Sequence, residues 1–254
     1  MSEERLKVDL SGKTAIVTGG SRGIGKAISL ALSQAGASVV IAARTEEESA
    51  SLPGTIHKTA EEIKELGGQA LPIRCDVTNA DDIQRMVKET IEIYGTINIL
   101  VNNAGVLHGA SFLETEPSDF QNVLAVNVTG PFLCSRAVLP HMISQKSGSI
   151  INISSGLAES THPGNNVYSA SKAALNHMML KLAAEVTKHN IAVNLVYPGM
   201  IRSDGMMARL QGAMLDRIPP PSIVGPPVVW LAAQDAASFT GKIVQVNTFG
   251  SEWP

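Results

Sequence analysis

Short apolar runs rich in β-branched residues alternate with segments of helical periodicity along nearly the whole chain. Strands that are apolar throughout are typical of a parallel sheet with helices covering both of its faces. The alternation therefore predicts an α/β fold of the doubly wound kind, with a mostly parallel seven-stranded sheet. The expected strands are Lys13–Thr18, Ser38–Ala42, Ala70–Ile73, Ile97–Asn102, Ser149–Ile153, Ile191–Val196 and Lys242–Val246. The expected helices are Arg22–Gly36, His57–Leu66, Asn79–Tyr94, Pro117–Val128, Pro131–Gln145, Tyr168–His189 and Val228–Gln234.

The composition favours one domain spanning residues 1–254 and argues against several classes of partner. Apolar residues make up 44% of the chain, enough for a substantial core, and no linker, repeat or low-complexity segment divides it. A net charge of −3 gives no electrostatic reason to expect nucleic acid or an anionic membrane surface. No run approaches the ~18 apolar residues of a membrane-spanning helix, and Met1–Asp9 contains no apolar signal segment.

The cysteines and histidines favour a cytoplasmic protein without a metal site. Cys75 and Cys134 lack CxxC spacing and are too few for a disulfide framework, so we expect reduced thiols. The six histidines show no metal-ligand spacing.

A glycine-rich turn, Thr18-Gly19-Gly20-Ser21-Arg22-Gly23-Ile24-Gly25, lies between the first expected strand and its helix. Gly19 permits a tight turn, while Gly23 and Gly25 let the backbone and the helix approach a pyrophosphate and the sheet. The helix N-terminus offers free N–H groups and a positive dipole end to the phosphates. The turn predicts a Rossmann-type dinucleotide site. Its expected contacts are Gly19, Ser21, Arg22, Gly23, Ile24 and Gly25.

The end of the second strand indicates which dinucleotide is preferred. A carboxylate there would bond the ribose of NAD and repel a 2′-phosphate, but the strand ends in Ala43 and continues with Arg44 and Thr45. Arginine suits a phosphate because its planar fork makes bidentate, charge-assisted bonds, and Arg22 is a second cation nearby. We therefore expect NADP(H) rather than NAD(H). The following connection, Thr45–Lys58, is longer than such units usually need and is interpreted as a solvated surface insertion.

The third strand is followed by Asp76 and Val77, where an adenine edge could lie. The Asp76 carboxylate could accept a hydrogen bond from the adenine amino group or cap the following turn. The sequence favours neither role.

Several ordered motifs together resemble those of the short-chain dehydrogenase/reductase family, in its ordinary single-domain type with a Tyr-x-x-x-Lys motif. The resemblance covers about residues 10–247. It rests on the glycine-rich turn, Asp76, Asn102-Asn103-Ala104-Gly105, Asn127, Ser155, Tyr168-Ser169-Ala170-Ser171-Lys172 and Pro198-Gly199.

The resemblance implies hydride transfer between a nicotinamide and a carbonyl or alcohol, and the residue types suit that chemistry. The oxyanion that forms on reduction needs a proton, which Tyr168 can donate, although an unperturbed phenol has a pKa near 10. Lys172 lies four residues later on the same helical face, so we expect its charge to lower the pKa of Tyr168. By resemblance Lys172 also holds the nicotinamide ribose, Ser155 aligns the substrate oxygen, and Asn127 anchors a water that links Lys172 to solvent.

The remaining expected cofactor contacts also come from the resemblance. Asn103, Ala104 and Gly105 are expected to give structural support and backbone contacts, and Pro198-Gly199 to shape the nicotinamide site together with Ile201. Ser203 stands where the family usually has a threonine. The last strand departs from the family's acidic-Gly-Gly ending, because it reads Val246-Asn247-Thr248-Phe249-Gly250.

The substrate side and the assembly are predicted less directly. We expect Met200–Pro221 to form a flap with an apolar inner face, which favours a moderately hydrophobic ketone, aldehyde or secondary alcohol, unless these side chains pack on the protein itself. Its apolar residues are Met200, Ile201, Met206, Met207, Leu210, Met214, Leu215 and Ile218.

The helix from Tyr168 is apolar nearly all round, which indicates a second subunit, and the resemblance implies a homotetramer or a homodimer.

The sequence thus predicts an NADP(H)-dependent oxidoreductase acting on carbonyl or alcohol groups. One alternative is an enoyl-thioester C=C reductase of the same fold, in which tyrosine and lysine tend to be spaced differently. Another is a non-catalytic NADP(H)-binding scaffold or sensor, which would typically lack the counterparts of Tyr168 or Lys172.

Overall fold

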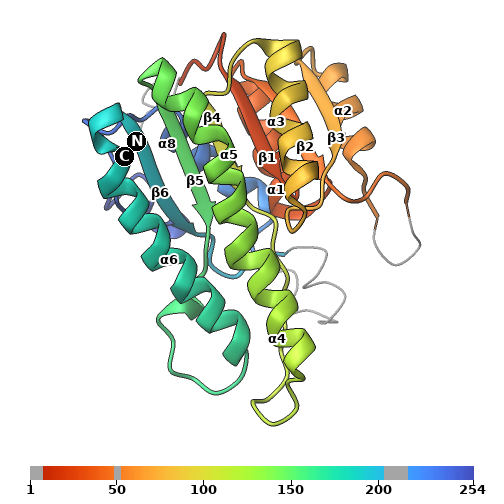
Figure 1. The fold of residues 1–254 in the computed structure, drawn as a ribbon, viewed down its shortest axis with the longest axis vertical. Coiled ribbons are helices and arrows are strands. Elements are labelled where there is room, and N and C mark those ends of the chain that lie inside the picture. Colours follow the sequence, from red (N-terminus) through yellow and green to blue (C-terminus); the bar gives the residue numbers. More distant parts are fainter. Residues whose placement is uncertain (1–7, 49–52, 203–216) are drawn as a thin grey trace.

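The computed structural model describes residues 8–48, 53–202 and 217–254, and its centre is a seven-stranded sheet in which every pair of neighbours is parallel (Figure 1). The strand order is β3-β2-β1-β4-β5-β6-β7. The predicted doubly wound, Rossmann-type fold is therefore confirmed. The strands are β1 (Thr14–Thr18), β2 (Ser38–Ala43), β3 (Ala70–Arg74), β4 (Ile99–Asn102), β5 (Gly148–Ile153), β6 (Ile191–Tyr197) and β7 (Ile243–Gln245).

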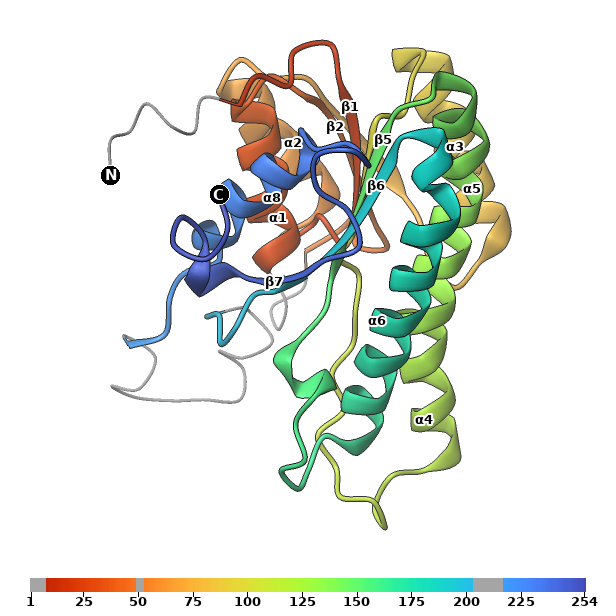
Figure 2. The ribbon, with the colours of Figure 1, turned by 90° about the vertical axis from the view of Figure 1, so that its left-hand side faces the viewer.

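Helices cover both faces of the sheet (Figure 2). One face carries α1 (Gly23–Gln34), α2 (Ile56–Glu65) and α8 (Gly225–Ala232). The other carries α3 (Ala80–Tyr94), α4 (Pro117–Leu124), α5 (Gly130–Gln145) and α6 (Asn166–Val186). Short turns of 3-10 helix are η3 (Gly156–Ala158), η4 (Thr187–His189), η6 (Pro221–Val224) and η7 (Val246–Thr248).

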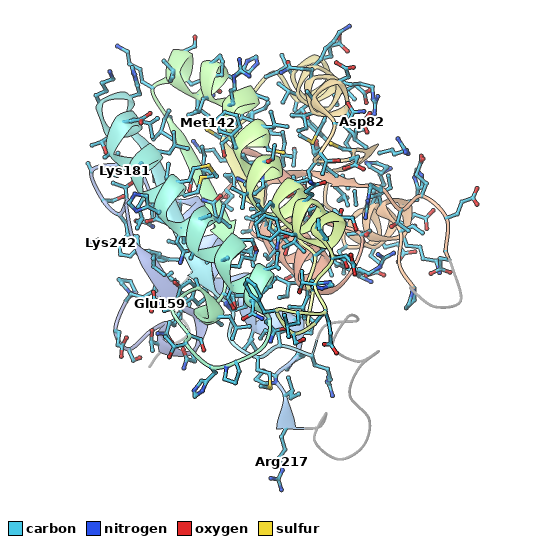
Figure 3. The ribbon with its side chains drawn as sticks, turned by 60° about the horizontal axis from the view of Figure 1, so that its bottom comes forward. Asp82, Met142, Glu159, Lys181, Arg217 and Lys242 are labelled. Carbon is cyan, nitrogen blue, oxygen red and sulfur yellow. The ribbon has the colours of Figure 1, made fainter. Side chains whose placement is uncertain are left out.

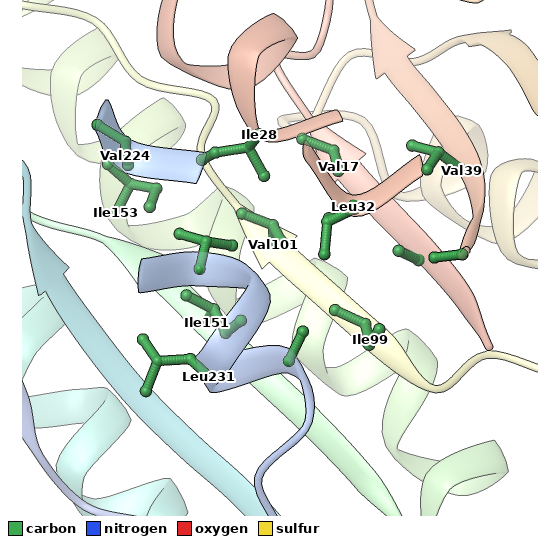
Figure 4. Close-up of a cluster of buried hydrophobic side chains, with 14 of the residues drawn as sticks. Val17, Ile28, Leu32, Val39, Ile99, Val101, Ile151, Ile153, Val224 and Leu231 are labelled. Carbon is green, nitrogen blue, oxygen red and sulfur yellow. The ribbon is translucent and has the colours of Figure 1, made fainter. Parts of the chain in front are cut away.

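Successive strand residues bury their side chains in two separate cores, as a sheet covered on both faces requires. In β1, Val17 faces the core beneath α1, α2 and α8, whereas Ile16 faces the core beneath α3, α5 and α6. Figure 4 shows the first core, in which Ile28 and Leu32 of α1 lie over the sheet beside Val101. This packing holds the strands in place and thereby positions the residues that follow each strand.

The strand order reverses between β1 and β4, which are neighbours although two βα units separate them in the chain. Ligands of open α/β sheets bind at the carboxyl ends of strands at such a reversal. The glycine-rich turn after β1 and the segment Asn103–Gly105 after β4 therefore meet at one edge.

The segment Pro117–Gln145 differs from the prediction of two separate helices, because it is helical throughout and contains a π-helical turn, η2 (Ala125–Thr129). Pro131 has no N–H to donate to the carbonyl four residues earlier, and the wider turn just before it accommodates that loss. Asn127 lies in this turn and is fully buried.

By length and composition this long helical segment could cross a membrane, which the sequence had not suggested. Its two parts, however, pack on other elements of the fold: α5 packs against β4, β5 and α3, and α4 packs against α6. The segment is thus accounted for by the fold.

Boundaries at several other elements differ from expectation by a few residues. The helix α6 begins at Asn166, before Tyr168, and α8 begins at Gly225. The last strand is short because the chain folds back after it: the Trp253 Nε1 donates to the Gln245 carbonyl at 2.9 Å. The rings of Trp230, Phe239, Phe249 and Trp253 form one aromatic cluster.

Candidate active site

The glycine-rich turn is closed by contacts that leave no room for larger residues. Gly19 and Gly23 have φ angles of +67° and +55°, which favour glycine. A Cβ on Gly25 would lie 2.2 Å from the Gly19 carbonyl oxygen and 2.4 Å from the Asn103 Nδ2. The Asn103 amide in turn donates to the carbonyls of Thr18 and Gly19, at 2.9 and 3.2 Å. Glycine is thus required for the close packing of turn, helix and β4.

Thr18 fastens the same edge and was not singled out from the sequence. Its hydroxyl donates to the Val101 carbonyl and accepts from the backbone N–H groups of Asn103 and Ala104. A threonine at the end of a buried strand, directly before a glycine, was the only signal. The predicted supporting role of Asn103 and Ala104 fits these contacts.

The first turn of α1 fits a phosphate group. Arg22 is the N-cap residue, and its side chain makes no capping hydrogen bond to the described backbone. The N–H groups at the start of a helix have no partner within the helix, so those of Gly23, Ile24 and Gly25 remain for a ligand. Ser21, just before them, is buried.

The Arg22 side chain, which was expected to contact the cofactor phosphate, binds two backbone carbonyls of the protein. Its guanidinium Nε and Nη2 donate to the carbonyls of Pro53 and Gly54, at 3.1 and 2.9 Å. Gly54 has a φ of +95°, and a Cβ there would lie 2.7 Å from the Ser21 carbonyl oxygen. The interpretation of Thr45–Lys58 as a solvated insertion is wrong for this part, because it packs on the glycine-rich turn and Thr55 caps α2.

Arg44 follows β2 directly and has an exposed side chain, while the Thr45 carbonyl accepts from the Ile56 N–H. The Arg44 Nη1 lies 3.7 Å from the Asp76 Oδ2, so the two predicted cofactor residues face each other. The Asp76 Oδ1 accepts from the N–H and the hydroxyl of Thr78, which is the turn-capping role left open above. Burial opposes ionisation of Asp76, but the Thr78 bonds and the Arg44 charge outweigh it and lower its pKa.

Ser155, Tyr168 and Lys172 come together at the carboxyl end of β5. The Ser155 side chain lies close enough to the Tyr168 phenol to lower the pKa of that phenol. The Lys172 Nζ lies 5.6 Å from the centre of the Tyr168 ring and donates to the Ile153 carbonyl at 2.9 Å. The predicted cluster thus forms from the end of one strand and the first turns of α6.

The pKa values of this cluster correct one expectation. Burial raises the pKa of Tyr168, and Ser155 only partly offsets this, so the chain alone does not acidify the phenol. Lys172 is 4% exposed, and burial lowers the pKa of its amine to about 8. The pKa of Tyr168 is thus raised and not lowered as expected, because burial of the phenol is the largest effect on it.

Asn127 connects the cluster to the segment after β4. Its amide Nδ2 donates to the Val106 carbonyl and to the Ser171 hydroxyl, at 2.9 and 3.0 Å, and its Oδ1 accepts from the Val106 N–H. A Cβ on Gly105 would lie 3.4 Å from the Asn127 Oδ1 and 3.7 Å from the Lys172 Nζ. The predicted residues Asn127, Gly105 and Lys172 are therefore neighbours.

The remaining predicted cofactor residues lie at or beneath the same edge. Pro198 is buried at the end of β6, and Gly199 follows with a φ of +77°. The side chains of Val77 and Ile201 are buried in the two cores, so only their backbones are placed to contact a ligand. Ser203 and most of the expected flap lie outside the described residues.

The two ends of that flap differ in exposure where the structure describes them. Met200 is 64% exposed directly after Gly199, whereas Ile218 is buried. Across residues 8–48, 53–202 and 217–254, no group of three histidine, cysteine or acidic side chains is arranged to hold a metal.

The fold and the site together define a protein built to hold a dinucleotide beside a tyrosine–serine–lysine cluster. The model of the short chain dehydrogenase family matches residues 13–213. The 3-oxoacyl-(acyl-carrier-protein) reductase of Synechocystis sp. is 36% identical, covering 94% of this chain and 96% of that protein. The chain belongs to the short-chain dehydrogenase family, whose members are oxidoreductases that bind a nicotinamide cofactor.

Two solved structures show the same architecture. A short-chain dehydrogenase/reductase from Mycobacterium marinum superposes with a TM-score of 0.85 at 34% identity, covering 98% of this chain and all of that one. A candidate NAD(P) dependent gluconate 5-dehydrogenase from Beutenbergia cavernae, with bound NADP at low occupancy, gives a TM-score of 0.84 at 29% identity. That match covers 94% of this chain and 97% of the other.

Proposed function

We propose that this chain transfers a hydride between NADP(H) and a ketone, aldehyde or secondary alcohol of moderately hydrophobic character. The observation that carries the proposal is the meeting of Tyr168, Ser155 and Lys172 at the sheet edge that also holds the glycine-rich turn. The Synechocystis relative is, by its name, a reductase of an oxo group, which favours carbonyl chemistry.

Each residue has a defined task in this proposal. A bound nicotinamide would supply the hydride on reduction and accept it on oxidation, and its oxidised form would carry a positive charge. Tyr168 gives its proton to the substrate oxygen on reduction and takes it back on oxidation. Ser155 donates a hydrogen bond to the same oxygen and so orients the carbonyl. Lys172 holds the ribose, and Asn127 fixes the backbone beside the amine and anchors the water that links it to solvent.

The preference for NADP(H) over NAD(H) rests on Arg44. Its exposed guanidinium stands at the end of β2, where a 2′-phosphate would replace Asp76 as its anionic partner. We assign Arg22 to the phosphate only indirectly, since its donors hold Pro53 and Gly54 in place against the turn.

We expect kcat/KM over a panel of ketones and aldehydes to be at least about tenfold higher with NADPH than with NADH. Arg44→Ala should raise the KM for NADPH about tenfold and leave that for NADH within about threefold, because one charge-assisted phosphate contact is lost. Arg74→Ala, a neighbouring exposed arginine that faces Glu46 and Asp82, is the matched control. A preference for NADH would refute the cofactor assignment.

The same panel separates the two alternatives. An enoyl-thioester reductase would oxidise NADPH only with an α,β-unsaturated thioester, and a scaffold or sensor would bind NADPH without turnover. The retained cluster of Tyr168, Ser155 and Lys172 favours the carbonyl reaction over both.

We also propose that the protein is a cytoplasmic homotetramer, with a homodimer as the alternative. The outer side of α6 is less apolar than expected, since His177, Lys181 and Glu185 are exposed along it. Support comes instead from the adjoining helices, where Phe120 of α4 and Phe132 of α5 are 45% and 47% exposed. Light scattering at micromolar concentration should give the mass of four chains. The mass of a single chain would contradict the assembly.

A further inference from the structure

Four side chains form a hydrogen-bonded chain behind the Ser155 turn. The Ser154 Oγ donates to the Asn176 Oδ1 at 2.6 Å, and the Asn176 Nδ2 donates to the Tyr197 hydroxyl at 2.6 Å. The Tyr197 hydroxyl donates to the Glu159 Oε1 at 2.8 Å. None of these residues was assigned a role by the sequence or by the cluster described above.

Each member of this chain adjoins a part of the candidate active site. Ser154 precedes Ser155, Asn176 follows Lys172 by one turn of α6, and Tyr197 precedes Pro198. Glu159 lies at the end of η3, on the connection that leads into α6 (Figure 3). The chain therefore joins the Ser155 turn, α6 and the end of β6.

Burial makes these contacts specific. Ser154, Asn176 and Tyr197 are only 2%, 7% and 6% exposed, so a lost partner would leave a polar group without water. The Tyr197 ring also packs behind the turn itself, because its Cδ2 lies 3.9 Å from where a Cβ on Gly156 would be. The Tyr197 ring thus lies near Gly156, and its hydroxyl binds Glu159 at the end of the turn.

The carboxylate of Glu159 fixes the direction of every bond in the chain. An ionised carboxylate only accepts, so the Tyr197 hydroxyl donates to it and accepts from the Asn176 amide nitrogen. The Asn176 oxygen is then left to accept from Ser154. Burial and the nearby Glu159 raise the pKa of Tyr197 to about 12, so its phenol stays protonated as this donor. Because every hydrogen bond from Ser154 to Glu159 has only one possible donor and acceptor, the four side chains are held in a single arrangement.

We propose that Tyr197 is a positioning residue that, through Glu159 and Gly156, sets where the Ser155 hydroxyl points. The inference rests on the proposed carbonyl chemistry, in which Ser155 orients the substrate oxygen. The Ser155 hydroxyl also accepts from the Leu157 N–H at 3.2 Å, so its direction follows the backbone of this turn. A displacement of about 1 Å at a reacting group can lower a rate by about 10²-fold, and a partial displacement by less.

Tyr197→Phe keeps the ring and removes the hydroxyl. We expect kcat with the carbonyl substrate to fall about tenfold, while the dissociation constant for NADPH stays within about twofold, because the glycine-rich turn is untouched. Glu159→Ala should have the same effect, and Glu159→Gln, which keeps an acceptor oxygen, should stay within about threefold of wild type. The double variant Tyr197→Phe/Glu159→Ala should be no slower than either single variant. Tyr94→Phe, at the end of α3, is the matched control.

A second measurement does not need turnover. The N–H groups of Leu157, Ala158, Glu159 and Ser160 are all bonded within this turn. Their hydrogen exchange, followed by mass spectrometry, should accelerate in Tyr197→Phe and Glu159→Ala but not in Tyr94→Phe.

Three results would overturn the positioning role: unchanged exchange in the turn, wild-type kcat in Tyr197→Phe, or additive losses in the double variant. Failure of the proposed function would be recognised by a different result. In that case the wild-type protein turns over no carbonyl, whereas the exchange experiment still decides whether Tyr197 holds the turn.

Discussion

Tyr168→Phe should lower kcat/KM for carbonyl reduction by about 10²- to 10⁴-fold, which is the range expected when a positioned proton donor is lost. The substitution removes one hydroxyl from a half-buried ring and leaves the glycine-rich turn intact. The phenol is the proton donor in the proposed reaction, and phenylalanine has no hydroxyl to take its place.

The measurement is the oxidation of NADPH with the best substrate of the panel, together with NADPH binding by fluorescence. Binding should stay within about threefold of wild type, because the loss concerns the chemical step. A Tyr168→Phe variant that reduces carbonyls at the wild-type rate would remove the basis of the proposed function. A variant that no longer binds NADPH would show instead that the phenol supports the cofactor site.

Lys172→Met should abolish most of the activity and yet make the protein more stable near neutral pH. The lysine amine is almost fully buried without a described carboxylate partner, and burial lowers its pKa from 10.5 to about 8. Keeping it charged in the fold at about pH 7 costs on the order of 3 kcal/mol at about 1.4 kcal/mol per pKa unit. Part of this is offset by the bond to Ile153, so we expect a gain of about 1–3 kcal/mol in the free energy of unfolding.

The stability difference between Lys172→Met and the wild-type protein should depend on pH. Between about pH 8 and pH 10.5 the unfolded chain holds the Lys172 proton and the folded chain does not, so wild-type stability rises with pH in that range. The advantage of Lys172→Met should therefore be full below about pH 8 and should shrink as the pH approaches 10.5. Denaturant unfolding at about pH 7 and about pH 9 tests this, with Lys181→Met, an exposed lysine of the same helix, as the control. A less stable Lys172→Met at about pH 7 would show that the amine stabilises the fold.

The order and type of the elements could be predicted from the sequence because strand and helix periodicities differ and the strands are apolar throughout. What the periodicity did not give was the π-helical turn at Ala125–Thr129, in which Asn127 bonds across to Val106. The fold-back after β7 depends on Trp253, eight residues beyond the carbonyl that it binds.

The candidate site was predictable where spacing along one element brings groups together, as for Tyr168 and Lys172 on α6. Contacts between elements far apart in sequence were not. Arg22 binds the carbonyls of Pro53 and Gly54, more than thirty residues away, and spacing along the chain does not reveal such bonds. The raised pKa of Tyr168 was missed for a related reason, because spacing shows a neighbouring charge but not the burial that outweighs it.

The closure of the glycine-rich turn by Thr18 and Asn103 has a consequence for how a dinucleotide associates. Those bonds are internal to the protein, so the cradle that we propose for the phosphates is held in one conformation by the protein itself. A preformed cradle loses little conformational entropy on association, and more of the contact energy then appears as affinity. Differences in affinity between related dinucleotides should accordingly reside in how fast each one leaves.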